Sequence, residues 1–374
     1  MVYMSGGGLR RWLGEMLTTS FPATRMAFAY GSGVFSQQTA AEVRAATNGN
    51  QEAPMIDLVL TVDNPTMWHK ENIQRNRNHY SAAAYVGSSF IAKTQETAAA
   101  VWYNTLVPIP EPWGDGRQLM KYGVISSHAL EKDLRTWSSF YISGRMQKPI
   151  AWIEGYKMSD SNKKDFIGYG VDGKIAEKVD LVKAGQTNLK GALAAALLQL
   201  PNTFTEGQLY ETITGLSYAG DFRMAIAENP DKITNIVKNG GSPARFRKLY
   251  EPFLSEMKSV TCLDNRIDNS DILNVRFEQD VTKNARINML NELPLEIQKR
   301  MTLNLNQNGN NDGDADALIS EKLANAMRLT LSTLVGQTAL KQTMKGLASA
   351  GVTKSAVYSM SKIRKKIKGG KNKI

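Results

Sequence analysis

The first 150 residues of the chain alternate between short apolar runs and longer polar segments. Apolar and β-branched side chains fill the runs, which is typical of buried strands. Three strands are predicted in this way: residues 25–30 (RMAFAY), 55–62 (MIDLVLTV) and 119–126 (LMKYGVIS). Residues 39–46 predict a helix between the first two strands, and apolar residues at helical spacing predict another from His128 to near Gly144. This order of elements indicates an α/β domain that ends near Pro149.

The second half of the chain is mostly helical in pattern. Residues 188–218 contain two apolar helical runs separated by a Pro/Asn turn, and Thr205 is the expected N-cap of the second helix. The polar, glycine-rich residues 156–173 predict a surface insertion or a linker. Residues 304–320 are rich in Asn, Asp and Gly and predict a disordered spacer. A small helical module therefore follows the α/β domain.

Composition limits the class of protein. With 374 residues, 42% of them hydrophobic, the chain is long enough for two modest cores. Its one cysteine, Cys262, excludes an internal disulfide framework and fits a reducing compartment. The longest uncharged apolar stretch, Gly191 to Pro201, is shorter than the roughly 20 residues that a membrane-spanning helix needs. A two-domain enzyme that does not cross a bilayer is the expectation.

The net charge of +11 is concentrated near the C-terminal end. No acidic residue follows Glu321, whereas the same stretch carries twelve lysines and arginines, so the rest of the chain is close to neutral. A basic tail on a near-neutral body predicts an anionic surface as partner, either a nucleic acid or an acidic membrane. At the other end, residues 1–25 are either a flexible start or an amphipathic mitochondrial presequence.

A Gly-Ser-Gly loop and an aspartate are the first candidates for chemistry. Gly31 and Gly33 flank Ser32 at the end of a predicted strand, where backbone N–H groups and a hydroxyl can hold a phosphate. Alone, such a tripeptide is more often an ordinary turn. In the next strand, period-2 alternation puts Asp57 and Asp63 on one face. A carboxylate beside a phosphate loop suits Mg²⁺-dependent nucleotidyl transfer, although each aspartate also fits a cap, an ion pair or a turn.

Several cations have two possible roles. Lys121 lies inside a predicted strand, which places it either at a sheet edge or in an active site. Arg145 and Lys148 follow a predicted helix, where cations either cap the helix end or bind a phosphate, and capping is favoured without other evidence. Asp221 and Arg223 fit a salt-bridged helix start. The three histidines have no metal-ligand spacing.

The chain resembles the mitochondrial phosphatidate cytidylyltransferases, also called translocator assembly and maintenance proteins. The resemblance runs in order from Ala27 to Tyr358, and insertions interrupt it after Phe35, at Tyr156 to Gly173 and at Asn306 to Asp316. It is carried by these strings: FAYGSGVF, MIDLVLTVDNPTMWH, NRNHYS, KYGVIS, DLRTWSSFYISGRMQKP, LSYAGDFRMAIAENPDKITNIV and KQTMKGLASAGVTKSAVY. Many motifs in register are far more specific than the Gly-Ser-Gly tripeptide alone.

The resemblance implies a fold of class α/β (α+β). Its first domain has the nucleotidyltransferase fold with a mixed sheet, and a mostly helical, winged-helix-like domain and an amphipathic basic C-terminal segment follow. The expected division is: N-terminus 1–25, nucleotidyltransferase domain 26–150, winged-helix-like domain 176–256, a segment packing on both domains 257–305, a disordered spacer 306–317 and a membrane-associating segment 318–374.

The implied activity is Mg²⁺-dependent transfer of CMP from CTP to phosphatidic acid. The products are pyrophosphate and CDP-diacylglycerol, which feeds cardiolipin synthesis, and the place is the matrix face of the mitochondrial inner membrane. The second metal ligand is in doubt because Val59 replaces the second acid of the general nucleotidyltransferase pattern, which leaves Asp63, Asp221 and Asp280 as candidates. The expected site residues are: catalytic, Asp57, Lys121 and Asp221; nucleotide-binding, Gly31, Ser32, Gly33, Lys121 and Tyr122; substrate phosphate-binding, Arg145, Lys148, Arg223 and Lys232; metal, Asp57 and Asp63.

The tail supplies the expected route to the lipid. Apolar residues near one helical face with basic residues around them predict a helix that lies in the membrane interface. The expected membrane contacts are Met360, Ile363, Arg364, Lys365, Lys366, Ile367 and Lys368. Two other functions stay open, a nucleotidyltransferase acting on RNA and a non-catalytic maintenance factor for a membrane translocase. Nucleic acid is not expected, because the tail offers only Tyr358 for stacking on bases.

Overall fold

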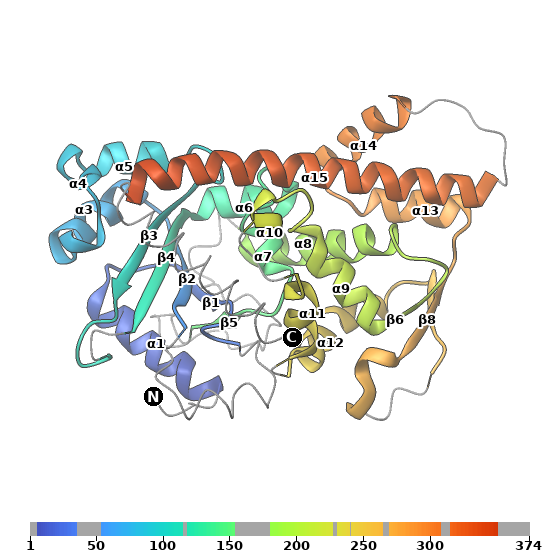
Figure 1. Cartoon of the computed structure of the whole chain (residues 1–374), viewed down its shortest axis with the longest axis horizontal. Helices are drawn as coiled ribbons and strands as arrows, with labels where there is room; N and C mark the ends of the chain where they lie inside the picture. Colours follow the sequence, from blue (N-terminus) through green and yellow to red (C-terminus); the bar gives the residue numbers. More distant parts are fainter. Residues whose placement is uncertain are drawn as a thin grey trace. The chain divides into compact units, whose positions relative to one another are not determined.

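A computed structural model of the chain forms two compact units (Figure 1). The first unit comprises residues 1–131, 150–182 and 340–374, and the second comprises residues 132–149 and 183–339. The structure describes these residues: 6–35, 54–114, 118–153, 180–226, 230–239, 241–264, 269–307 and 315–350.

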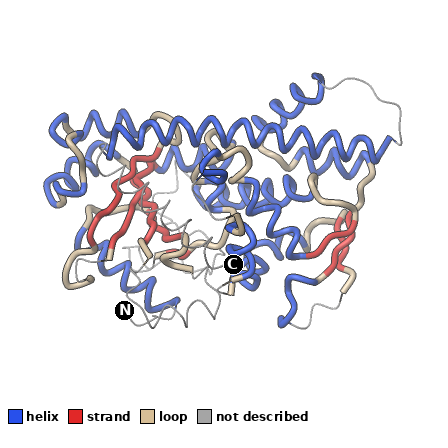
Figure 2. The backbone as a smooth tube through the Cα atoms, in the orientation of Figure 1, coloured by secondary structure: helices blue, strands red, loops and turns tan. Residues whose placement is uncertain are grey.

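A five-stranded mixed sheet forms the centre of the first unit (Figure 2). Its strands are β1 (Met26–Tyr30), β2 (Ile56–Val62), β3 (Val101–Pro108), β4 (Leu119–Ser126) and β5 (Ala151–Trp152). Their order is β3-β4-β2-β1-β5; β2 and β4 are parallel, and the other pairs are antiparallel. The three strands predicted from apolar runs are confirmed, whereas the predicted helix at residues 39–46 lies outside the described residues.

One face of this sheet is covered by α1 (Gly6–Ser20) and α3 (Pro65–Arg75). Leu13, Met16 and Leu17 of α1 are fully buried against strand residues such as Leu58 and Leu60. Burial of that apolar stripe stabilises a helix which the polar residues around it would not hold by themselves. Residues 6–20 are therefore a packed helix, and the expectation that residues 1–25 are a presequence stays a prediction.

Short elements link α3 to the edge strand β3: η1 (Arg77–His79), α4 (Ala83–Val86) and α5 (Ser88–Gln95). The last part of α15 (Ala315–Ala350) is attached here, because its residues from 340 onward belong to the first unit. Lys345 Nζ donates to the carbonyl oxygens of Gln95 (3.1 Å) and Thr97 (2.7 Å), and Gln342 Nε2 donates to that of Val101 (3.2 Å). These bonds fix the end of α15 to the segment between α5 and β3.

The second unit is mostly helical and has a small antiparallel sheet of order β6-β8-β7. Its strands are β6 (Thr203–Thr205), β7 (Val260–Cys262) and β8 (Arg276–Gln279). Its helices include α7 (Ser143–Met146), α8 (Leu181–Leu197, of which residues from 183 belong here), α9 (Glu206–Leu216), α10 (Phe222–Ile226), α11 (Lys232–Lys238), α12 (Ser242–Leu254), η2 (Asn269–Asn274), α13 (Lys283–Asn291), α14 (Leu295–Gln307) and α15 up to residue 339. Helices with a small sheet are consistent with the predicted winged-helix-like module.

Two predictions about helix ends can be compared directly with the structure. Thr205 is the N-cap of α9, and a reciprocal bond pair with Gln208 completes the capping box, as predicted. The helix expected from His128 to Gly144 instead ends early, because α6 spans Ser127–Thr136 and Trp137 has a φ of +52°. Apolar residues continue at helical spacing beyond α6 because the turn that follows it, which contains Trp137 and Tyr141, is also buried.

Candidate active site

The loop after β1 is a tight turn that depends on two glycines. Gly31 has a φ of +79°, in the region that favours glycine, and its carbonyl oxygen accepts bonds of 3.1 and 2.9 Å from the N–H groups three and four residues further on. A β-carbon on Gly33 would stand 2.4 Å from the carbonyl oxygen of Met55, so only glycine fits there. Within the described residues, the N–H groups of Ser32 and Gly33 have no hydrogen-bond acceptor. The turn thus has backbone donors available for an anion.

Asp57 and Lys121 lie next to this turn on neighbouring strands. The antiparallel β1–β2 register pairs Tyr30 with Asp57, and the parallel β2–β4 register pairs Asp57 with Lys121. Lys121 Nζ lies 4.0 Å from Asp57 Oδ1 and 4.4 Å from the ring centre of Tyr103. A β-carbon on Gly31 would stand 3.3 Å from Asp57 Oδ2. We call the turn at residues 31–35 the Gly31 turn. The carboxylate of Asp57 and the ammonium of Lys121 therefore lie beside it on one face of the sheet.

The position of β4 excludes the edge placement considered for Lys121, and its role in an active site stays a prediction. β4 lies between β3 and β2, so Lys121 is in the sheet interior and not at an edge. Its side chain is 14% exposed and that of Asp57 is 23% exposed, so a ligand can reach both groups. A partly buried ion pair interacts more strongly than one in bulk water, because less solvent screens the charges.

Tyr122, expected at the nucleotide, points to the opposite face of the sheet. Its hydroxyl is fully buried and accepts bonds from Asn72 Nδ2 (3.0 Å) and Asn104 Nδ2 (2.7 Å), and it lies 3.0 Å from His79 Nδ1. Burial raises the pKa of Tyr122 well above its ordinary value. Adjacent residues of a strand face opposite ways, so Lys121 and Tyr122 cannot line the same site. The expectation that Tyr122 binds nucleotide is corrected.

Asp63 is separated from Asp57 by the length of β2. Six residues of strand span about 20 Å, at about 3.3 Å for each residue. Asp63 Oδ1 instead accepts hydrogen bonds from Arg25 (2.8 Å) and the Ser127 hydroxyl (2.5 Å). Although alternation does put the two aspartates on one face, a single metal ion cannot reach both. The pairing of Asp57 with Asp63 as ligands of one metal is therefore corrected.

The other acids considered as metal ligands also have partners in the second unit. Both carboxylate oxygens of Asp221 accept bonds from Arg223, at 2.9 Å from Nε and 2.7 Å from Nη2. Burial opposes ionisation of Asp221, but the bonds and charge of Arg223 outweigh it and hold the pKa of Asp221 below its ordinary value. Asp280 is exposed and accepts from the backbone of Thr282 (2.8 Å). Among the described residues, no group of three or more His, Cys, Asp or Glu is placed to hold a metal ion.

Four cations expected to bind phosphate gather in the second unit. Lys148 and Lys232 share one aromatic ring, with Nζ atoms 5.0 and 4.9 Å from the ring centre of Tyr218. Arg145 stacks at 3.9 Å on Tyr141, and the charges of Arg145 and Arg223 lie close enough to affect each other's protonation. Asp221 pairs with Arg223 in this group. We call these residues the cation cluster: Arg145, Lys148, Arg223 and Lys232.

Lys148 is the most buried member of the cation cluster. Its Nζ lies 2.6 Å from both the Gly144 carbonyl oxygen and the Ser217 hydroxyl. Burial, together with the charges of Arg145 and Lys232, holds the pKa of Lys148 well below its ordinary value. The contact of Lys148 with the Gly144 carbonyl oxygen of α7 is consistent with the helix-capping role considered from the sequence. The other three members of the cation cluster, in contrast, are consistent with a site that binds an anion.

Asp133, which the sequence did not single out, holds the segment that carries Arg145 and Lys148. Its buried carboxylate accepts four backbone N–H bonds of 2.9 to 3.1 Å from residues 139, 140, 142 and 143, and a bond from the Ser139 hydroxyl (2.8 Å). Trp137 and Phe140 in this segment have φ values of +52° and +53°, which cost free energy in residues other than glycine. The sequence did carry one signal of this role, because Asp133 is a charged residue within an apolar helical pattern.

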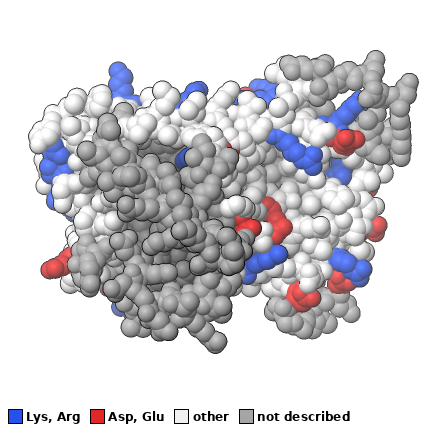
Figure 3. Space-filling view, viewed as in Figure 1, with Lys and Arg blue, Asp and Glu red and all other residues white. Residues whose placement is uncertain are grey.

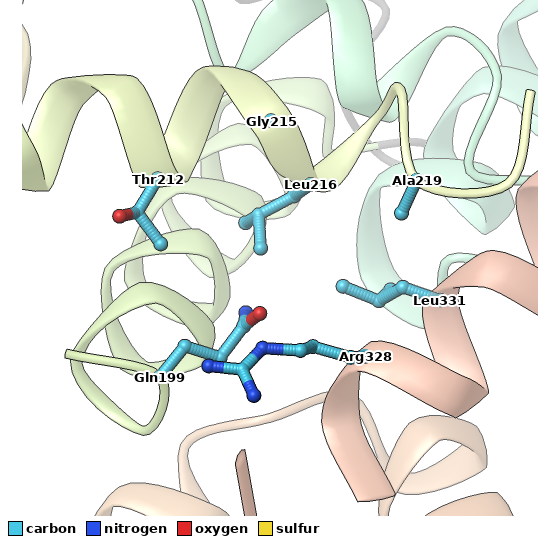
Figure 4. Close-up of a pocket in the computed structure, with 7 residues that line it drawn as sticks. All are labelled: Gln199, Thr212, Gly215, Leu216, Ala219, Arg328 and Leu331. Carbon is cyan, nitrogen blue, oxygen red and sulfur yellow. The ribbon is translucent and has the colours of Figure 1, made fainter. Parts of the chain in front are cut away.

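A separate cavity of about 240 Å³ lies in the second unit (Figure 4). It is lined by Gln199, Thr212, Gly215, Leu216, Ala219, Arg328 and Leu331. Figure 4 shows the guanidinium of Arg328 beside Gln199, with apolar side chains around the space. None of the expected site residues lines this cavity. The expected membrane contacts from Met360 to Lys368 lie outside the described residues.

Comparison with known proteins extends the resemblance over nearly all of the chain. The sequence model of a family described as "Phosphatidate cytidylyltransferase, mitochondrial" matches residues 13–167 and 172–365. The protein of that name from Mus musculus is 34% identical over 378 residues, which cover 100% of this chain and 98% of the relative. That from Bos taurus is 35% identical, covering 92% and 91%. That from Schizosaccharomyces pombe is 34% identical, covering 91% and 79%.

Proposed function

Because this chain belongs to the family of mitochondrial phosphatidate cytidylyltransferases, which are enzymes, we propose that it transfers CMP from CTP to phosphatidic acid. A phosphate oxygen of phosphatidic acid attacks the α-phosphorus of CTP, and the bond from that phosphorus to the bridging oxygen of pyrophosphate breaks. The products are CDP-diacylglycerol and pyrophosphate. The observation that carries the proposal is the carboxylate of Asp57 beside the Gly31 turn, since this pairing is what nucleotidyl transfer requires.

In this proposal the Gly31 turn binds CTP through its phosphates. The backbone donors of Ser32 and Gly33 suit phosphate oxygens, and the Ser32 hydroxyl, which is exposed, adds another donor. Lys121 supplies a positive charge close to Asp57, because its Nζ lies 4.0 Å from Asp57 Oδ1. An ammonium in this position neutralises phosphate charge that increases as pyrophosphate leaves.

Mg²⁺ is the proposed cofactor, and the Asp57 carboxylate beside the Gly31 turn is suited to hold it. Mg²⁺ is commonly held by one or two carboxylates together with substrate phosphates, so the single carboxylate of Asp57 is sufficient on the protein side. The partly exposed Asp57 carboxylate beside the turn supports this assignment. When bound, Mg²⁺ would neutralise phosphate charge and orient the reacting groups. Asp57 would hold the ion, and the Gly31 turn would fix the phosphates next to it.

The cation cluster is the proposed site for a substrate phosphate. Four basic side chains close to one another, which contact the rings of Tyr141 and Tyr218, support this assignment because clustered positive charge attracts an anion. No strong general base is needed, because a phosphate oxygen of phosphatidic acid is already an anionic nucleophile. Charge neutralisation and positioning therefore supply most of the rate in this proposal.

The proposed location is the matrix face of the mitochondrial inner membrane, where the product supplies cardiolipin synthesis. The relatives are named as mitochondrial. In the part of the chain that the structure describes, no helix is long and apolar enough to cross a membrane. The basic tail, with seven lysines and arginines from Lys362 to Lys373, is the proposed bilayer contact.

A direct assay tests the proposed function. The purified full chain is incubated with labelled CTP, Mg²⁺ and phosphatidic acid, and the lipid extract is examined for label. Label in CDP-diacylglycerol, lost in Asp57→Asn, is the expected result. A parallel reaction contains RNA in place of phosphatidic acid. Label in RNA and not in lipid would reassign the chain to an RNA nucleotidyltransferase, and no label in either would favour a non-catalytic maintenance factor.

A further inference from the structure

Three large apolar side chains are exposed together at the junction of α4 and α5. Tyr85 is 85% exposed, Val86 is 66% exposed and Phe90 is 47% exposed. We call these three residues the α4–α5 ridge. They lie within six consecutive positions of a unit whose other apolar side chains mostly fill two buried clusters. Exposed apolar residues gathered in this way mark an interaction surface, whereas single ones do not.

The ridge is presented by a well-packed support. Ile91 of α5 is fully buried with Tyr80 and Trp102, and Ala83 and Ala84 of α4 pack against the same group. The outer side of the pair is mixed, because Ser89 and Lys93 of α5 are exposed beside the three apolar residues of the ridge. Gly87 joins them at a φ of +110°, which only glycine adopts readily, and so turns the chain between Val86 and Phe90.

The surroundings of the ridge are cationic. The guanidinium of Arg77 lies 4.0 Å from the ring centre of Tyr85. Between Asn72 and Gln95 the sequence has three basic residues and no Asp or Glu. On the face drawn in Figure 3, the surface over α4 and α5 is mostly white with blue beside it. An aromatic residue paired with a cation is a typical anchor at a bilayer interface.

The α4–α5 ridge is also tied to the start of the basic tail. Lys345 of α15 is hydrogen-bonded to Gln95 and Thr97, immediately after α5, and Figure 1 shows the end of α15 beside α5. This end of α15 exposes Leu340, Met344 and Leu347. The expected membrane-associating segment, residues 318–374, continues from this end of α15 into residues 351–374. The ridge and the start of the tail therefore belong to the same part of the first unit.

We propose that the α4–α5 ridge inserts into the interface of an anionic bilayer and is a second membrane contact, formed by the folded body of the protein. The inference rests on the proposed function, since a substrate that resides in a bilayer requires the enzyme to touch one. Tyr85, Val86 and Phe90 supply the apolar contact, and Arg77 supplies the charge for lipid phosphates. The chain leaves α5 into β3, whose first residue Val101 pairs with Ile125 at the C-terminal end of β4, whereas Asp57 and Lys121 pair near the N-terminal ends of β2 and β4. The ridge is therefore an anchor and not the mouth of the active site.

A fluorescent probe at Val86 tests the insertion directly. In the full chain with Cys262→Ser, Val86→Cys carries an environment-sensitive probe, and Leu303→Cys on α14, where the native leucine is 64% exposed, carries the same probe as control. Vesicles of phosphatidylcholine are compared with vesicles that also contain phosphatidic acid. The Val86 probe is expected to shift to the blue and to be quenched by a lipid-attached quencher with the anionic vesicles only, and the control probe is not.

Three results overturn the inference. The first is a protein that sediments with anionic vesicles while the Val86 probe stays unchanged, because the tail then makes the contact alone. The second is a blue shift that follows protein concentration without vesicles, because the ridge then binds a second copy. A protein that binds no vesicles also overturns it.

A substitution series measures how much the ridge contributes. Replacing Tyr85, Val86 and Phe90 by Ser together is expected to lower the vesicle partition coefficient at least about tenfold, because each buried apolar side chain contributes more than the free energy of a tenfold change. The matched control replaces Leu295 and Leu303 by Ser, both of which are exposed in the second unit. An equal loss in the control contradicts the inference.

The same variants separate this inference from the proposed function. CMP transfer to short-chain phosphatidic acid dispersed in detergent is expected to be normal in the ridge variant, and transfer to bilayer phosphatidic acid is expected to fall. Equal loss on both substrates overturns a membrane role for the ridge. Absence of transfer by the unmodified chain in detergent would instead refute the proposed function, whatever the vesicle experiments show.

Discussion

Gly31 and Asp57 are so close that a β-carbon on the glycine would stand 3.3 Å from Oδ2 of the aspartate. The two residues are 26 positions apart in the chain, and the pairing of Tyr30 with Asp57 across β1 and β2 brings them together. A side chain at position 31 would therefore disturb the proposed phosphate turn and the proposed metal ligand at once. This proximity is the basis of the first two predictions.

Gly31→Ala is expected to abolish CTP binding with only a moderate loss of stability. The positive φ costs an alanine about 1–2 kcal/mol, and its β-carbon would displace the carboxylate of Asp57. Gly87→Ala is the matched control, because Gly87 has a φ of +110° but no atom within 4 Å of the added carbon. Calorimetric titration with CTP measures the difference. Normal CTP affinity in Gly31→Ala would show that the loop is only a turn.

Asp57→Asn is expected to abolish CMP transfer while the protein stays folded. The amide keeps the size of the carboxylate but loses the charge that would hold Mg²⁺ and pair with Lys121. Activity and the thermal unfolding midpoint are measured together. Asp63→Asn is the comparison. This variant is expected to leave transfer nearly unchanged, because Asp63 pairs with Arg25 at the other end of β2. Near-normal turnover in Asp57→Asn refutes its role.

Arg145→Gln is expected to raise the KM for phosphatidic acid about 10- to 100-fold, because a charged hydrogen bond to phosphate is typically worth about 1.5–3 kcal/mol. Lys190→Gln serves as control, since Lys190 pairs with Glu256 on the surface, where an ion pair contributes little. Steady-state kinetics and the unfolding midpoint distinguish the two roles of Arg145. A lower midpoint with unaltered kinetics would support helix capping.

Asp133→Asn is expected to lower the free energy of unfolding by about 2–4 kcal/mol, because an amide nitrogen replaces an acceptor and leaves two buried N–H groups unpaired. Ser139→Ala, which removes only one hydroxyl donor to Asp133, should cost about 1 kcal/mol. Urea unfolding of both variants gives the comparison. Equal costs would mean that the backbone bonds to Asp133 contribute little to holding the segment that carries Arg145.

Stability is expected to fall as the pH drops from about 6.5 to about 4, because of His69. Burial lowers the pKa of His69 to about 4, and a hydrogen bond with Gln95 only partly opposes this shift. Within that range the unfolded chain binds a proton that the folded protein does not, so protonation favours unfolding. The loss is at most about 3 kcal/mol.

Unfolding free energies measured at pH 7.5 and 4.5 test this expectation. His69→Gln is expected to reduce the pH dependence, whatever its effect on stability at pH 7.5. His128→Gln is expected to keep the dependence, because His128 is exposed. A pH dependence that is the same in His69→Gln and in the unmodified chain would contradict the assignment.

Local pattern was sufficient for the elements that surround the candidate site. The apolar runs predicted β1, β2 and β4, and Thr205 predicted the start of α9, because strand alternation and helix capping depend on nearby residues. Family resemblance also singled out Gly31 and Asp57, and the strand register confirms that they are neighbours. Alternation would equally have placed Lys121 and Tyr122 on opposite faces of β4, since the period of a strand is two.

By itself, the sequence determined which residue types stand at each strand, turn and helix start, and so it determined the fold class. Only the tertiary structure decided the partner of each charged side chain. Arg25 forms an ion pair with Asp63, Arg223 forms one with Asp221, and Lys148 is buried beside Ser217. It also decided that residues 6–20 pack as a helix and that Asp133 holds the turn after α6. The physical reason is that hydrogen bonds, ion pairs and burial join residues that are distant in the chain, whereas periodicity fixes only the face on which a side chain lies.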